Sequence, residues 1–221
     1  MSFVPLAGAC PRCALPLGSA AVCGRCLLHP PAYDATDAAY VYAFPLDRLI
    51  QAFKYNGALS LGGWFAEAML DTRQVPAVGD LIIALPLSPG RQRERGFNHS
   101  LEIARILSRR TGIRVAADAA IRVRETPPQA TLPWSDRASN VRGAFACPRN
   151  AIVAGRSIIV IDDVMTTGAS LDEFARTLKR AGAARVENWL VARTLPPDGP
   201  LAQPMFAAAH ATPLATRGAA H

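Results

Sequence analysis

Residues 158–170, IIVIDDVMTTGAS, decide the fold. The run Ile158 to Ile161 is apolar without interruption, which is typical of a strand buried on both faces in a parallel sheet. Asp162 and Asp163 follow this run, and a loop of small residues then leads into a helix with an apolar face. We therefore expect a strand–loop–helix unit whose two carboxylates stand at the carboxyl end of the strand.

The loop after this strand has the composition of a phosphate site. Backbone N–H groups around Thr166 to Ser170 are expected to converge at a helix N-terminus, where free donors and the helix dipole favour an anion. Ser170 and Glu173 also fit a capping box. The upstream carboxylates can accept hydrogen bonds from vicinal sugar hydroxyls, so the unit predicts a pocket for a ribose 5-phosphate group. The alternative is a tight turn with ordinary caps, which we disfavour because two desolvated carboxylates are costly without partners.

Strands and helices alternate along the chain, which indicates an α/β fold with a mainly parallel sheet flanked by helices. Ligands in such sheets bind beyond the carboxyl ends of strands, so the site should follow Leu87 and Asp163. The apolar patterns predict strands at 38–44, 80–87, 119–124, 156–163 and 184–193, and helices at 45–55, 61–72, 98–110, 137–145 and 171–182.

A basic loop is expected after the strand at 80–87, in the sequence SPGRQRERGFNHS, with Asn98 and Ser100 as candidate caps of the next helix. Arginine forks bind phosphate oxygens in pairs, so this segment predicts a second anion site that suits pyrophosphate. The alternative is a solvated basic loop without a ligand. The candidate pyrophosphate-binding residues are Arg91, Arg93, Arg95, Gly96 and Asn98.

The formal net charge of +7 is concentrated in one part of the chain. Residues 91–156 contain 13 Arg, no Lys and five acids, a surplus of +8, whereas the remainder has 11 basic and 12 acidic residues and sums to −1. A polyanionic ligand is the functional interpretation of this cluster. A compositional bias toward Arg is the alternative, but it explains the choice of residue and not its location.

Four of the five cysteines form two CxxC pairs near the N-terminus. Four thiolates in this arrangement suit a closed, structural zinc site. A redox-active pair is the alternative, and we disfavour it because neither pair is expected at a helix start. Cys147 is interpreted as ordinary packing. The candidate metal ligands are Cys10, Cys13, Cys23 and Cys26.

A third motif, T-x2-Q-x2-L-x4-R-x2-N-V-x-G-A-F, runs from Thr126 to Phe145. A mobile lid that excludes water from a reacting bond is one interpretation, with Gln129, Arg137 and Asn140 as its candidate residues. A proline-rich loop without a direct role is the other.

The string at 158–170 resembles the phosphoribosyl-pyrophosphate motif of type I phosphoribosyltransferases, an apolar run and two acids followed by T-T-G-x-[ST]. By this resemblance Asp162 and Asp163 hold the ribose hydroxyls, and magnesium bridges the pyrophosphate and ribose oxygens. The resemblance assigns the 5-phosphate to Thr166, Thr167, Gly168, Ala169 and Ser170.

The order of the motifs identifies the chain as a member of the ComF/GntX family, over a span from Cys10 to Arg193. The four-cysteine module, KYNG at 54–57, R-x-R-G-F-N at 93–98 and the third motif carry this resemblance together with DDVMTTGAS. It implies a type I phosphoribosyltransferase fold that binds phosphoribosyl pyrophosphate or a nucleotide and acts on incoming single-stranded DNA during competence. Single-stranded DNA and DNA-uptake proteins are the partners it implies. The family's Pro-Val-Pro before the basic loop is replaced here by Ala84-Leu85-Pro86.

The composition and the distribution of residue types along the chain bound the protein class and the expected units. Half of the 221 residues are hydrophobic, which excludes wholesale disorder, and neither a membrane span nor a signal peptide is evident, so we expect a cytoplasmic protein. The expected units are a zinc module at 1–36, a phosphoribosyltransferase-like domain at 37–195 and a low-complexity tail at 196–221. An active transferase that acts on an unknown base or amine is the alternative function. A glutamine amidotransferase is disfavoured, because position 2 is Ser and the zinc module takes the place of a glutaminase domain.

Overall fold

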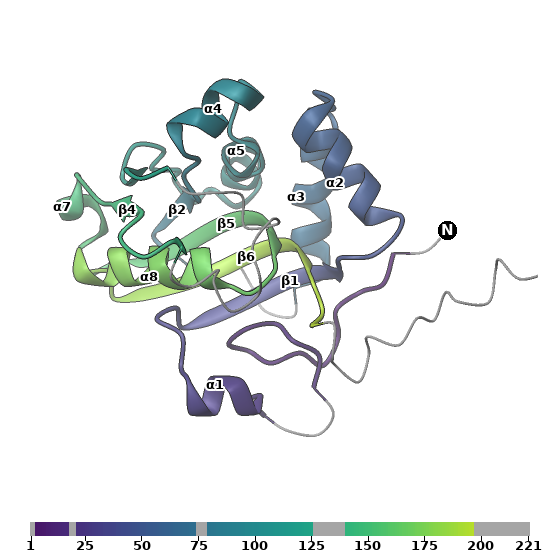
Figure 1. Ribbon diagram of the computed structural model, residues 1–221, viewed down its shortest axis with the longest axis horizontal. Helices are drawn as coiled ribbons and strands as arrows, with labels where there is room; N and C mark the ends of the chain where they lie inside the picture. The colour runs from purple at the N-terminus through teal and green to yellow at the C-terminus, as the bar shows by residue number, and fades with distance from the viewer. Residues whose placement is uncertain (1–2, 18–20, 74–78, 126–139, 197–221) are drawn as a thin grey trace, which may run out of the picture.

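The computed structural model describes residues 3–17, 21–73, 79–125 and 140–196, and every structural statement below concerns these residues. Four parallel strands form the central sheet in the order β1-β6-β5-β2 (Figure 1). A separate antiparallel pair is formed by two short strands, β3 and β4. The bounds are β1 Ala35–Val41, β2 Leu81–Ala84, β3 Ile121–Arg122, β4 Phe145–Ala146, β5 Ser157–Met165 and β6 Arg185–Arg193.

Helices cover both faces of the sheet (Figure 1). Ile159 and Ile161 of β5 face a core built with three helices, whereas Ile158 and Val160 face the other side, so the apolar run is buried on both faces as predicted. The first face carries α2 (Leu46–Tyr55), α3 (Leu61–Asp71) and α5 (His99–Thr111), and the second carries α8 (Ala169–Arg180). Short helices are α1 (Gly24–Leu28), α4 (Pro89–Arg95) and α7 (Asn150–Val153).

The N-terminal segment packs onto the α8 face of the domain. Cys10, Cys13 and Tyr33 share one hydrophobic core with Phe174 of α8 and Leu190 of β6. Residues 4–6 also extend the sheet, because backbone hydrogen bonds join them to the free edge of β1. The four-cysteine segment is therefore fixed against the domain by apolar burial and by main-chain pairing.

Most of the predicted elements are confirmed, and the differences have physical causes. The helices expected at 45–55, 61–72 and 98–110 and the strand expected at 184–193 are present as α2, α3, α5 and β6. The strand expected at 38–44 begins earlier, at Ala35, because its parallel pairing with β6 starts there. The strand expected at 119–124 is reduced to β3, which pairs only with β4.

Two further predictions about local structure are wrong. The basic segment after β2 is not a loop: Ser88 accepts a hydrogen bond from the backbone N–H of Arg91 and Pro89 occupies the first turn, so α4 forms there. The helix expected at 137–145 is helical at Asn140 but does not continue to 145, since residues 141–143 form a turn and Phe145 begins β4. Residues 137–139 lie outside the described residues, and so does the expected tail except for Pro196.

In the described part of the chain, no helix has both the length and the apolar character needed to cross a membrane.

Candidate functional site

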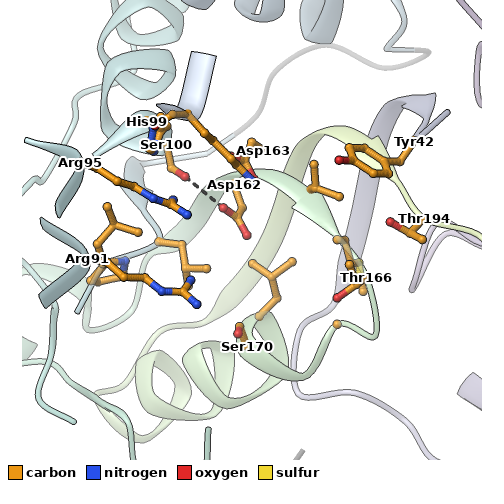
Figure 2. Close-up of a pocket in the computed structure, with 18 of the residues that line it drawn as sticks. Tyr42, Arg91, Arg95, His99, Ser100, Asp162, Asp163, Thr166, Ser170 and Thr194 are labelled. Carbon is orange, nitrogen blue, oxygen red and sulfur yellow. Dashed lines mark hydrogen bonds and ion pairs between the residues drawn. The ribbon is translucent and has the colours of Figure 1, made fainter. Parts of the chain in front are cut away.

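A cavity of about 630 Å³ opens beyond the carboxyl ends of β2 and β5, where the sequence places the site (Figure 2). Side chains from α2, α4, α5, β3 and β5 line it, together with the loop between β5 and α8. Among the described lining residues, four cationic side chains face two carboxylates. They are Lys54, Arg91, Arg95, Arg122, Asp162 and Asp163.

The two carboxylates lie near the carboxyl end of β5 as predicted, but the strand continues two residues beyond the predicted end at Asp163. The parallel pairing of β5 with β6 continues through Met165, so the strand extends beyond its apolar run. Asp162 accepts a hydrogen bond from Ser100 Oγ of α5 at 3.0 Å (Figure 2). Burial, and after it the charge of Asp163, raises the pKa of the Asp162 carboxyl to about 7. A carboxylate with this pKa can hold or release a proton near neutral pH.

Asp163 is paired with Lys54, the first residue of the KYNG motif. Lys54 Nζ of α2 lies 2.9 Å from Asp163 Oδ1, and both side chains are largely buried. Burial alone would lower the pKa of the Lys54 ammonium, but the attraction of Asp163 outweighs it, so the pKa is raised and the cation is retained. The Lys54 carbonyl in turn contacts His99 Nε2 at 3.0 Å. The C-terminal turn of α2 thus fixes one acid of the pair.

The phosphate loop, residues 166–170, turns at Gly168 into α8. Gly168 is the N-cap with a φ of +84°, a conformation that favours glycine, and a Cβ there would also displace the terminal methyl of Met165. Thr166, Gly168 and Ser170 line the cavity. Thr167 is buried behind them, with its Oγ1 accepting a hydrogen bond from the backbone N–H of Ala169 at 3.3 Å. The loop therefore presents a helix N-terminus to the cavity.

The predicted capping box is wrong. Ser170 lies inside the first turn of α8 and not at its N-cap, which makes no side-chain cap hydrogen bond. Glu173 instead accepts a hydrogen bond from the backbone N–H of Gly143 at 3.0 Å. This hydrogen bond joins α8 to the segment before β4.

Only part of the predicted pyrophosphate set reaches the cavity. Arg91 and Arg95 extend from α4 toward Asp162 (Figure 2), and Arg95 donates to the Tyr55 hydroxyl at 2.9 Å. Arg93 is exposed and does not line the cavity. Arg122 of β3, which the sequence analysis did not single out, joins the lining instead. A helix places alternate residues on different faces, which separates Arg93 from its neighbours.

Gly96 and Asn98 serve structural roles in this segment. Gly96 ends α4 with a φ of +76°. Asn98 caps α5, because its Oδ1 accepts from the Leu101 N–H at 3.3 Å and its Nδ2 donates to the Leu85 carbonyl at 3.0 Å. The cap predicted at Asn98 is thus confirmed, while Ser100 lies within α5. Neither Gly96 nor Asn98 lines the cavity.

Of the three candidate lid residues, two lie outside the described residues, namely Gln129 and Arg137. Asn140 is described and its backbone carbonyl accepts a hydrogen bond from Arg124 Nη2 at 2.8 Å. It does not belong to the described cavity lining.

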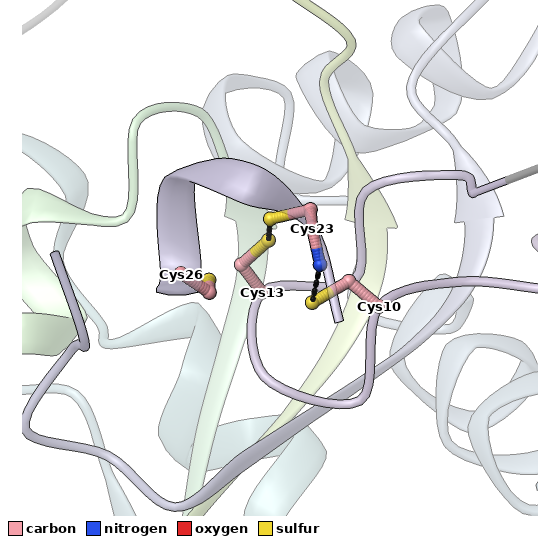
Figure 3. Close-up of side chains that lie close together, drawn as sticks. All are labelled: Cys10, Cys13, Cys23 and Cys26. Atoms are coloured by element: carbon pink, nitrogen blue, oxygen red, sulfur yellow. Dashed lines mark hydrogen bonds between the residues drawn. The ribbon is translucent and has the colours of Figure 1, made fainter. Parts of the chain in front are cut away.

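The four N-terminal cysteines form a cluster that fits a metal ion (Figure 3). Their Sγ atoms all lie within 4.8 Å of one another, and Cys13 Sγ lies 3.5 Å from Cys23 Sγ. Zinc bound tetrahedrally at about 2.3 Å from each sulfur would separate the sulfurs by about 3.8 Å, so the donor set fits that ion. Contrary to expectation, the second pair does stand at a helix start, since Cys23 is the N-cap of α1. The convergence of all four sulfurs nevertheless favours a metal site over a redox pair.

Known proteins are similar in sequence to most of this chain. A model of the phosphoribosyl transferase domain matches residues 98–195. DNA utilization protein YhgH of Escherichia coli O6:H1 is 36% identical over 193 residues, which cover 84% of each chain. Competence protein F of Haemophilus influenzae is 31% identical over 179 residues, 77% of this chain and 78% of that protein. A solved glutamine phosphoribosylpyrophosphate amidotransferase from B. subtilis matches 60% of this chain and 25% of its own, with 20% identity and a TM-score of 0.39.

Proposed function

The chain belongs to the ComF family and has a phosphoribosyltransferase-type domain, and we propose that its cavity binds a phosphoribosyl or nucleotide ligand in the handling of incoming single-stranded DNA. One observation carries the proposal. A glycine-dependent helix N-terminus, two carboxylates and several guanidinium groups face the same cavity. These are the groups that a phosphate, a sugar diol and a second phosphate group require.

Each group has a proposed role that follows from its position. The backbone of the phosphate loop receives the 5-phosphate, since the first turn of a helix has N–H groups without intrahelical partners and a dipole that favours an anion. Asp162 accepts hydrogen bonds from the ribose hydroxyls, and Asp163 beside it is held in place by Lys54. Arg91, Arg95 and Arg122 are suited to a pyrophosphate or a second phosphate, because paired guanidinium donors match phosphate oxygens.

Magnesium is proposed to accompany a pyrophosphate ligand and to offset its charge. Magnesium in proteins takes one or two carboxylates together with substrate phosphate oxygens. Asp162 is the carboxylate open to this role, because Asp163 is already paired with Lys54. The four cysteines are proposed to hold zinc in a structural site, as a closed set of sulfur ligands does.

A role in DNA handling is supported by the names of the relatives and by charge. The names of the two relatives refer to DNA utilization and to competence. The basic segment 91–156 supplies three arginines to the cavity, while Arg93, Arg124 and Arg142 of the same segment are exposed. Exposed arginines attract the backbone of a single strand, and affinity from such contacts falls steeply as salt rises.

Titration of phosphoribosyl pyrophosphate with magnesium into the protein tests the ligand assignment. We expect binding by the wild type and at least about tenfold weaker binding by Asp162→Asn, which removes a charged hydrogen-bond acceptor. Asp118→Asn is the matched control, because Asp118 is an exposed partner of Arg149 that does not line the cavity. Equal affinity in all three proteins would refute the assignment of the acid pair.

An active phosphoribosyltransferase is the second candidate. The observation that favours it is the set of cations beside Asp162, which could stabilise departing pyrophosphate. Incubation with phosphoribosyl pyrophosphate, magnesium and a panel of bases or ammonia distinguishes the two functions. Acceptor-dependent pyrophosphate release that Asp162→Asn abolishes would establish the enzyme. Binding without release would leave a recognition site.

A further inference from the structure

The four-cysteine segment contacts the phosphate loop. The contact is polar and specific: two arginines donate hydrogen bonds to carbonyl oxygens in and next to the loop. Neither arginine lines the cavity, and neither was singled out by the sequence patterns. They are Arg25, which stands between the cysteines of the second pair, and Arg193, the last residue of β6.

Arg193 joins a cysteine knuckle to the loop through a single guanidinium. Its side chain is completely buried, with Nε donating to the Cys13 carbonyl at 2.9 Å. Its Nη1 donates to the Met165 carbonyl at 2.8 Å and also to the carbonyl of Thr166. No carboxylate among the described residues pairs with it. A buried guanidinium is costly unless its donors are used; Nε and Nη1 are used by these carbonyls, while Nη2 has no partner among the described residues.

Arg25 makes the second connection. Its Nη2 donates to the Thr167 carbonyl at 3.2 Å, and because Arg25 stands between Cys23 and Cys26, its position depends on how that pair is held. Next to it, the N–H of Ala32 donates to Asp172 Oδ1 at 2.7 Å, in the first turn of α8. Both bonds come from the cysteine side of the molecule and reach the structure that forms the anion site.

Peptide geometry connects these contacts to phosphate binding. In a planar trans peptide the carbonyl and the N–H point in opposite directions. Holding the carbonyls of Thr166 and Thr167 from the cysteine side therefore aims the N–H groups of Thr167 and Gly168 away from that side. Orientation of backbone donors is what makes a helix N-terminus bind an anion.

We propose that Arg193 and Arg25 are positioning residues for the phosphate loop, and that metal binding by the four cysteines fixes them, so that affinity for a ligand phosphate depends on the metal. The proposal rests on the proposed function of the cavity. Among the described residues, the hydrogen bonds between the first cysteine pair and the second are weak contacts between the cysteines' own atoms, so a metal would supply the strong link between them. The metal then acts on the ligand through two arginines and the backbone.

The first experiment compares the zinc-loaded full chain with protein stripped by a zinc-selective chelator, with magnesium restored to both. Ribose 5-phosphate is the probe, titrated calorimetrically, and we expect about tenfold weaker binding after stripping. Hydrogen exchange of residues 166–170 in the absence of ligand provides a readout that does not need binding, and we expect faster exchange. A stripped protein that stays folded and has unchanged exchange and affinity overturns the proposal.

Variants measured with the metal bound test the proposal even if the stripped chain unfolds. We expect Arg25→Gln to weaken ribose 5-phosphate binding about threefold and Arg25→Lys to restore part of the loss. Arg12→Gln is the matched control, since Arg12 lies between the first two cysteines and makes no described hydrogen bond to the loop. A fall in thermal stability without a change in affinity or loop exchange would make Arg25 merely structural, which refutes the proposal.

The outcomes separate this proposal from the function it rests on. If the zinc-loaded wild type does not bind ribose 5-phosphate while loop exchange still increases on stripping, the ligand assignment fails and the coupling stands. If the wild type binds and neither stripping nor Arg25→Gln changes the binding, the coupling fails and the ligand assignment stands.

Discussion

The two walls of the cavity are built on different principles. The side-chain wall consists of Lys54, Arg95, Ser100, Asp162 and Asp163, and each of these groups is held by another side chain. The backbone wall is the phosphate loop, whose proposed ligand groups are peptide N–H groups, and the carbonyls of Thr166 and Thr167 are held by Arg193 and Arg25. The first wall depends on charge pairing and the second on backbone conformation.

This difference has consequences for how each wall tolerates change. A side-chain wall loses function when a charge is removed and recovers when a similar charge replaces it. A backbone wall contains no replaceable charge, but one added methyl group can deform it. Substitutions that separate charge from shape therefore test the comparison.

The largest effect is expected from Lys54→Met. It leaves the buried Asp163 carboxylate unpaired, which should lower the free energy of unfolding by about 3 kcal/mol, a value reduced for the partial exposure of Lys54. Chemical denaturation measures the change. Lys54→Arg keeps the charge and should restore much of the stability.

A double variant tests whether the cost comes from the unpaired charge. Lys54→Met combined with Asp163→Asn removes both charges, so it should be more stable than Lys54→Met alone, although its ligand affinity stays low. If the double variant is less stable by the sum of the two single effects, Lys54 and Asp163 do not act as a pair.

Gly168→Ala should have the next largest effect, on the backbone wall. The positive φ of Gly168 and the collision with Met165 together should cost about 2 kcal/mol of stability and weaken ribose 5-phosphate binding at least tenfold. Gly96→Ala is the control, because Gly96 has a similar φ of +76° with nothing near its added Cβ. It should lose about 1 kcal/mol from strain alone and bind normally. Equal binding losses in both variants would contradict the backbone wall.

The two walls also differ in how far they could be predicted from the sequence. The backbone wall is local: the apolar run, the acids and the small-residue loop are contiguous, so β5, the turn and α8 followed from pattern alone. The side-chain wall is assembled from distant segments. Lys54 and Asp163 meet only because α2 packs on the sheet face against β5, and no spacing rule predicts that contact.

The same distinction explains the errors. The helix α4 has no apolar face, so hydrophobic periodicity could not predict it. Ser88 and Pro89 were nevertheless a usable signal for a helix start. No local sequence pattern could predict the role of Arg193, because its partner Cys13 lies 180 positions away. The end of β5 was misplaced because pairing with β6, and not hydropathy, determines where the strand stops.

A moderate effect is expected from pH, and it belongs to the side-chain wall alone. Burial and Asp163 raise the pKa of Asp162 to about 7, against about 3.9 for an unfolded aspartate. Between these values the folded chain holds a proton that the unfolded chain has lost, so stability falls as pH rises toward 7. We expect a loss of about 2 kcal/mol between pH 5.5 and pH 7.5 in the ligand-free protein, measured by urea denaturation. Asp162→Asn should reduce this slope, and an unchanged slope would show that other groups cause it.

The smallest effect is expected from Arg95→Gln. This substitution tests whether the side-chain wall recognises the ligand by charge and not by shape. Arg95 lies over the Tyr55 ring and lines the cavity, whereas Arg93 on the same short helix is exposed. Arg95→Gln should weaken phosphoribosyl pyrophosphate binding about threefold, with less effect on ribose 5-phosphate, because only the former carries a pyrophosphate. Arg93→Gln should change neither affinity by more than a small factor. Equal losses from both substitutions would mean that the general positive field of the basic segment attracts the ligand, and the cavity's side-chain wall would then steer the ligand without selecting it.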